Sequence, residues 1–157
     1  MHLYIKQRIF TWGDKFSVYD ESGNEKYVVE GEIFTFGKKL HLYDLAGKEL
    51  AYIEQQLLTF LPRYMIYRGG EEFAEVVKEF TFFHPEYTVS GPGWCVRGDF
   101  FDHDYEVTDG TAVVASVTKE WFALGDAYEI SFGDGVDEIA ALAVVLVIDA
   151  CIDAQRN

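Results

Sequence analysis

The first repeated segment of the chain reads Ile9-Phe10-Thr11-Trp12-Gly13-Asp14-Lys15-Phe16-Ser17-Val18-Tyr19-Asp20. The same pattern returns as Ile33-Phe34-Thr35-Phe36-Gly37-Lys38-Lys39-Leu40-His41-Leu42-Tyr43-Asp44, at an offset of 24 residues from residue 9 to residue 33. A further step of 24 residues leads to a third copy, Leu57-Leu58-Thr59-Phe60-Leu61-Pro62-Arg63-Tyr64-Met65-Ile66-Tyr67. Less regular copies begin at Phe80, Phe100 and Trp121. Six copies within 157 residues indicate a domain built from one repeated unit.

Each unit has the pattern of two strands joined by tight turns. The segments 16–19 and 40–43 alternate and are rich in the residue types that strands favour. Turns are indicated at Gly13-Asp14 and Gly37-Lys38, and again at residues 20–24 and 44–48. Two strands from each of six units give about twelve strands, and a meander of that length tends to close on itself. We therefore predict a mainly β, closed antiparallel barrel of about twelve strands, spanning about residues 3–132.

The end of the chain departs from this pattern. Every residue from Ile139 to Ile148 is apolar, and Asp137 and Glu138, which come just before, suit the first turn of a helix. A helix that is apolar on all sides must be buried, and the lumen of a closed barrel is where it can be enclosed. The sequence thus predicts one domain over residues 1–157, with a central hydrophobic helix at about residues 136–152.

A transmembrane helix is the main alternative for this segment. Ten apolar residues span about 15 Å, roughly half of a hydrocarbon core of about 30 Å. Acidic residues flank the run on both sides, and Arg156 is the one basic residue near it. A buried strand rich in valine and isoleucine is a further alternative, but the alanines favour a helix.

The charge balance restricts the partners. The chain has 27 acidic and 13 basic residues, a net charge of −14 and a pI of about 4.5. This sign repels nucleic-acid phosphates and anionic head groups, so we expect no nucleic-acid partner. Two cysteines, Cys95 and Cys151, do not make a disulfide framework, and no signal peptide is visible, so a cytoplasmic location is expected.

Recognisable catalytic motifs are missing from the sequence. It contains no G-x-x-x-x-G-K-[ST] or G-x-G-x-x-G phosphate loop, no G-x-S-x-G elbow and no H-E-x-x-H helix. His103, between Asp102 and Asp104, is the histidine with acid–base neighbours, but no nucleophile or second ligand accompanies it. We expect neither an enzyme nor a cofactor.

Several segments together resemble a known family. They are the repeated Phe-x-x-Gly-Asp-x-Phe/Tyr corner, the stretch Gly98-Asp99-Phe100-Phe101-Asp102-His103-Asp104-Tyr105-Glu106-Val107, Lys119-Glu120-Trp121-Phe122, and the terminal run 142–149. Their order and spacing resemble the LURP-one-related family, most of all its prokaryotic members, over essentially the whole chain. The resemblance implies the fold of the tubby C-terminal domain and of phospholipid scramblases, a twelve-stranded barrel around a central hydrophobic helix. It implies no enzymatic activity. Tubby domains bind phosphoinositides through basic surface residues, and plant relatives are linked to defence, but none of those functional residues matches this chain by motif.

Two groups of residues are candidate sites. Acidic residues gather before the terminal run, near where scramblases place a proposed calcium segment, and their oxygens suit a hard divalent cation. These metal candidates are Asp126, Glu129, Asp134, Asp137 and Glu138. Scattered basic residues would contact lipid head groups if the fold brought them together. These lipid candidates are Lys6, Arg8, Lys15, Lys38, Lys39 and Lys119.

The sequence favours a non-catalytic binding or scaffold module with a protein partner, because a filled barrel leaves no interior ligand cavity. A protein that binds phosphoinositides or other lipid head groups, peripheral to the membrane, is the alternative. Scramblase-like lipid transport is the third interpretation, and the shortness of the apolar run weakens it.

Overall fold

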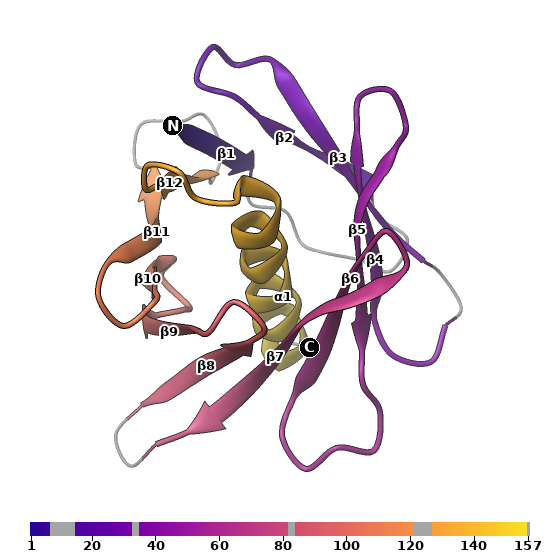
Figure 1. Cartoon of the computed structure of the whole chain (residues 1–157), viewed down its shortest axis with the longest axis vertical. Helices are drawn as coiled ribbons and strands as arrows, with labels where there is room; N and C mark the ends of the chain where they lie inside the picture. The colour runs from indigo at the N-terminus through magenta and orange to yellow at the C-terminus, as the bar shows by residue number, and fades with distance from the viewer. Residues whose placement is uncertain (7–14, 33–34, 82–83, 121–126, 157) are drawn as a thin grey trace.

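The computed structural model describes residues 1–6, 15–32, 35–81, 84–120 and 127–156, which form twelve strands and one helix (Figure 1). The strands are β1 His2–Lys6, β2 Lys15–Tyr19, β3 Glu25–Gly31, β4 Lys39–Asp44, β5 Glu49–Gln55, β6 Arg63–Arg68, β7 Glu71–Phe80, β8 Pro85–Ser90, β9 Trp94–Asp99, β10 Asp104–Thr108, β11 Val113–Glu120 and β12 Ala127–Phe132. The helix is α1, Glu138–Arg156.

The strands form one closed antiparallel barrel in which each pairs with its neighbours in the chain. Closure comes from β1, which pairs with β12 so that Leu3 lies opposite Ile130. The predicted barrel of about twelve strands is therefore confirmed. The helix starts two residues later than the predicted residue 136 and continues to Arg156, four residues past residue 152.

The hairpin turns repeat with the sequence. The carboxylate of Asp20 accepts hydrogen bonds of 2.9 Å from the backbone amides two and four residues further on, and Asp44 does the same at the next turn. Gly23 and Gly47 complete these turns with φ of 81° and 86°, which glycine adopts without steric cost. One aspartate and one glycine thus shape each of these two hairpins.

The corners at the opposite end of the barrel repeat as well. Thr35 donates a hydrogen bond of 2.9 Å to the carbonyl of Gly37, and Thr59 donates one of 2.8 Å to the carbonyl of Leu61. These threonines occupy the same position in two copies of the motif. Parts of four copies, within residues 7–14, 33–34, 82–83 and 121–126, lie outside the described residues.

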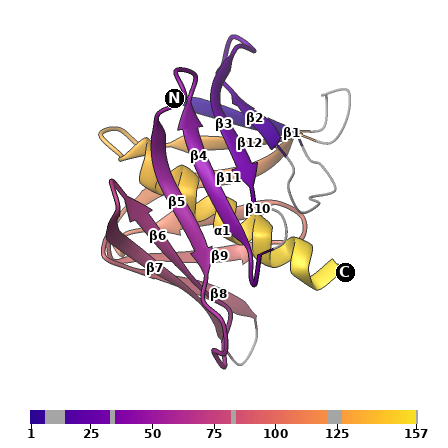
Figure 2. The ribbon, with the colours of Figure 1, turned by 90° about the vertical axis from the view of Figure 1, so that its right-hand side faces the viewer.

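Helix α1 passes through the middle of the barrel (Figures 1 and 2). Its residues from Ala140 to Ile148 are each at most 1% exposed. They pack against inward-facing strand residues such as Val18, Leu42 and Ile66, which occupy one position of the repeat. The lumen is a packed core, as the apolar run predicted. In the part of the chain that the structure describes, no helix is both long and apolar enough to cross a bilayer.

Candidate functional site

The filled lumen leaves the two barrel ends and the outer surface as places for a site. The odd-numbered strands end, and the even-numbered strands begin, at the end where α1 terminates. We call this end the C-terminal mouth; its corners contain Phe36, Phe60, Phe80 and Phe101. Figure 2 shows the last turns of α1 leaving the barrel there.

Buried tyrosines surround the last turns of α1 inside this mouth. Each fills the same position of the repeat on an even-numbered strand, and each is at most 2% exposed: Tyr64, Tyr87, Tyr105 and Tyr128. The Tyr128 hydroxyl donates to the Asp149 carboxylate on α1. The aromatic position of the motif therefore anchors the polar end of an otherwise apolar helix.

His103 belongs to this buried cluster. It is 4% exposed, its ring stacks on Tyr128 at 4.4 Å between centroids, and its Nε2 lies 3.7 Å from Asp149 Oδ1. Its φ of 51° fits the sharp corner between β9 and β10. These contacts make His103 part of the packed core at this end of the barrel.

The thiol of Cys151 lies in the same cluster, and burial raises its pKa to about 11. Cys95, on β9, is only half-buried, and both cysteines are free. A thiolate is the reactive form, and Cys151 supplies very little of it near neutral pH. We expect a thiol-specific disulfide reagent to modify Cys95 in the native protein and Cys151 only after unfolding. Equal modification rates for Cys95 and Cys151 in native buffer, or fast modification of a Cys95→Ser variant, would contradict the burial of Cys151.

The described lipid candidates all lie at the C-terminal mouth: Lys6, Lys15, Lys38, Lys39 and Lys119. The sixth, Arg8, lies outside the described residues. The fold thus gathers basic residues that are scattered in the sequence, because strand ends from distant segments meet there.

Some of these lysines also make internal contacts. Lys38 donates a hydrogen bond of 2.5 Å from Nζ to the carbonyl of Ala150 on α1. Burial lowers the pKa of Lys38. Lys15 lies 3.3 Å from the Glu30 carboxylate. Lys38 is therefore turned inward, and Lys15 is paired with a carboxylate.

Exposed apolar side chains form the outermost tier of the mouth. Leu58 and Phe60, in the corner between β5 and β6, are as exposed as in an extended chain, at 106% and 102%. Phe36, Phe80 and Phe101, on other corners, are exposed as well. The β3–β4 and β5–β6 corners lie against each other, since a Cβ at Gly37, next to Phe36, would lie 2.9 Å from the Leu57 side chain. The sequence showed these residues as a repeated motif but gave no sign that they face outward.

Three of the metal candidates make separate contacts with other side chains. Glu129 contacts His2, Asp137 contacts Arg68, and Glu138 accepts hydrogen bonds from Lys26 and Tyr27. Asp134 is exposed in the turn before α1, and Asp126 lies outside the described residues. Within residues 1–6, 15–32, 35–81, 84–120 and 127–156, no three His, Cys, Asp or Glu side chains are placed to hold a metal ion.

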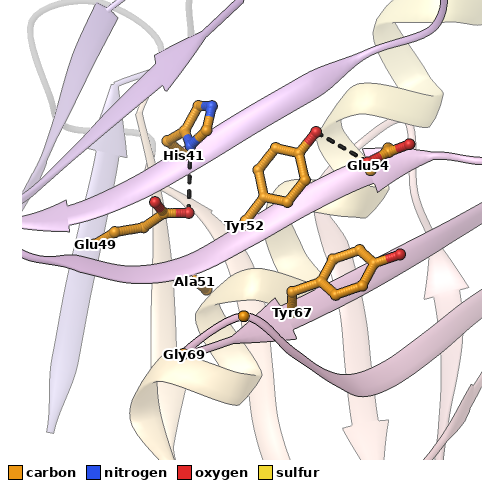
Figure 3. Close-up of a pocket in the computed structure, with 8 residues that line it drawn as sticks. His41, Glu49, Ala51, Tyr52, Glu54, Tyr67 and Gly69 are labelled. Carbon is orange, nitrogen blue, oxygen red and sulfur yellow. Dashed lines mark hydrogen bonds and ion pairs between the residues drawn. The ribbon is translucent and has the colours of Figure 1, made fainter.

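A groove of about 580 Å³ crosses the outer face of β4, β5 and β6 (Figure 3). Its walls include His41, Glu49, Tyr52, Glu54 and Tyr67. We call it the β4–β6 groove. Register places His41 directly opposite Tyr52, and Tyr52 directly opposite Tyr67. The rings therefore form a row across three strands, with centroids 4.8 Å and 5.8 Å apart.

Carboxylates border this aromatic row. His41 Nε2 lies 2.8 Å from Glu32, and Nδ1 lies 3.3 Å from Glu49. Tyr52 donates a hydrogen bond of 3.0 Å to Glu54. Burial and then the hydrogen bond to Glu54 raise the pKa of Tyr52. The carboxylates of Glu49 and Glu54 give the groove its negative charge.

This arrangement defines a twelve-stranded barrel module that encloses its own C-terminal helix and offers its sites on the surface. A family model described as LURP-one-related matches residues 1–149. Uncharacterized protein YxjI of Bacillus subtilis (strain 168) is 38% identical over 149 residues, which cover 95% of this chain and 92% of that protein. The X-ray structure of an Arabidopsis thaliana protein shares the fold, with a TM-score of 0.68 and 17% identity over 96% of this chain and 90% of that one. The chain belongs to the LURP-one-related family.

Proposed function

We propose that this protein is a non-catalytic binding module that associates with the surface of a lipid bilayer through its C-terminal mouth. The observation that carries this proposal is the tier of exposed apolar side chains on the corners, led by Leu58 and Phe60, with lysines at the strand ends behind it. Exposed apolar patches on this scale mark surfaces that bind partners or membranes.

The apolar side chains at the corner tips and the lysines behind them match two successive layers of a bilayer interface. Leu58 and Phe60 lie at the tip of their corner, where they would enter the boundary between head groups and acyl chains. Lys39 follows Phe36 at the start of β4, one level back from the tips, where an ammonium group would meet lipid phosphates. Apolar insertion has to supply most of the binding energy, because the net charge of −14 opposes anionic membranes.

The filled barrel supports a binding role over catalysis. The space in which small barrels hold a ligand is occupied by α1, and His103, the candidate acid–base residue of the sequence, is enclosed beside Tyr128. We propose that the module works in the cytoplasm, where its two free thiols would stay reduced.

Vesicle co-sedimentation tests the proposal. We expect the protein to sediment with phosphatidylcholine vesicles, and Leu58→Glu to weaken this binding about tenfold or more, since it removes an inserted leucine and adds a charge. Leu45→Glu is the matched control, because Leu45 is exposed at a hairpin tip on the opposite end of the barrel. A folded wild-type protein that stays in the supernatant, or an equal loss in both variants, would contradict the proposal.

A further inference from the structure

We propose that the β4–β6 groove binds the guanidinium group of an arginine side chain presented by a partner protein. This site is separate from the apolar tips of the C-terminal mouth, because it lies on the outer face of the sheet and uses none of the exposed leucines and phenylalanines of the corners.

The aromatic row provides the surface for such a group. Tyr52 and Tyr67 project side by side from neighbouring strands, with ring planes tilted by 31° (Figure 3). A planar cation that lies within about 6 Å of a ring centroid is attracted by the ring quadrupole. At about 580 Å³ the groove is far larger than a single ion requires, and it suits a long side chain with part of its backbone.

The charge of the groove selects a cation. Glu49 and Glu54 line it, and His41 is held between Glu49 and Glu32, which reaches it from the β3–β4 corner. Glu54 accepts a hydrogen bond from Tyr52 through one oxygen, and a carboxylate has further lone pairs for a second donor. An anion or a phosphopeptide would meet like charge here. An apolar segment would leave these carboxylates without new partners.

Arginine fits better than lysine for a geometric reason. A guanidinium group stacks flat on an aromatic ring while its edge donates two parallel hydrogen bonds to a carboxylate. Tyr52 and Glu54 offer a ring and a carboxylate two residues apart on the same face of β5. An ammonium group makes one point contact and cannot use both features at once.

Amide chemical-shift titration tests the site with three probes at one ionic strength: a capped tripeptide with arginine between two glycines, the same peptide with lysine, and methylguanidinium. We expect the arginine peptide to shift amides of β4, β5 and β6, and to bind at least about threefold tighter than the lysine peptide. Methylguanidinium that binds as well as the arginine peptide would show that the site takes a free guanidinium compound, whereas weaker binding would point to a peptide source.

Two glutamate variants separate this site from general attraction to an acidic protein. Glu54→Gln keeps an acceptor for Tyr52 but removes the charge, and we expect it to weaken the arginine peptide about fivefold. Glu106→Gln removes the same charge from β10, an exposed position outside the groove, and should change binding by less than about twofold. Equal effects of the two variants, equal affinity for the lysine peptide, or no shifts in β4–β6 would overturn the proposal.

Discussion

Leu146→Asp is expected to prevent folding of the barrel. Leu146 lies on α1 at the centre of the lumen and is 1% exposed. A carboxylate there would have no water and no cation, and burying such a group costs several kcal/mol at least. That cost is comparable with the total stability of a domain, about 5–15 kcal/mol. We expect little soluble protein and a circular dichroism spectrum of an unfolded chain.

Leu146→Met is the matched control, because it preserves volume and polarity. It should cost less than about 1.5 kcal/mol in the free energy of unfolding, measured by urea denaturation. Amide hydrogen exchange of the unmodified protein gives a second readout: residues 140–148 should exchange only through global unfolding. A native spectrum for Leu146→Asp, or rapid exchange through α1, would show that the barrel does not enclose the helix.

The enclosure of α1 could be predicted from sequence because two signals agree. The run from Ile139 to Ile148 has no polar side, so its burial follows from composition alone. The repeat of 24 residues gave the number of strands and the position of the hairpins, since Asp20 and Asp44 mark the same turn. Both signals are local, and neither depends on which strands pair.

The surface sites could not be predicted because they depend on long-range geometry. The row of His41, Tyr52 and Tyr67 requires the register of three strands, and a bulge between Leu42 and Tyr43 shifts the β4–β5 register by one residue next to the row. The apolar corners have the same composition as buried strand residues, so Leu58 and Phe60 carry no local sign of exposure. The convergence of the lysines follows from barrel closure, which the sequence predicted without giving the direction of each side chain.

The strand pairing that supports the buried tyrosines depends on Gly98. This residue lies opposite Tyr105 in the β9–β10 ladder and has a φ of 141°. A Cβ at this position would lie 2.5 Å from the Asp104 carbonyl oxygen and 2.5 Å from the Tyr105 Cα. Both are backbone atoms that cannot rotate away. Only the absence of a side chain allows β10 to approach closely enough to place Tyr105 beside α1.

Gly98→Ala is therefore expected to destabilise the protein by about 4 kcal/mol or more, because it adds a steric clash to backbone strain. Gly47→Ala provides the comparison: its φ of 86° carries similar strain, but its Cβ would meet nothing within 4 Å. That variant should cost about 1–2 kcal/mol. Urea denaturation of both variants measures the difference. Similar midpoints would mean that β9 and β10 are not in close contact at Gly98, and the position of Tyr105 against α1 would then be wrong.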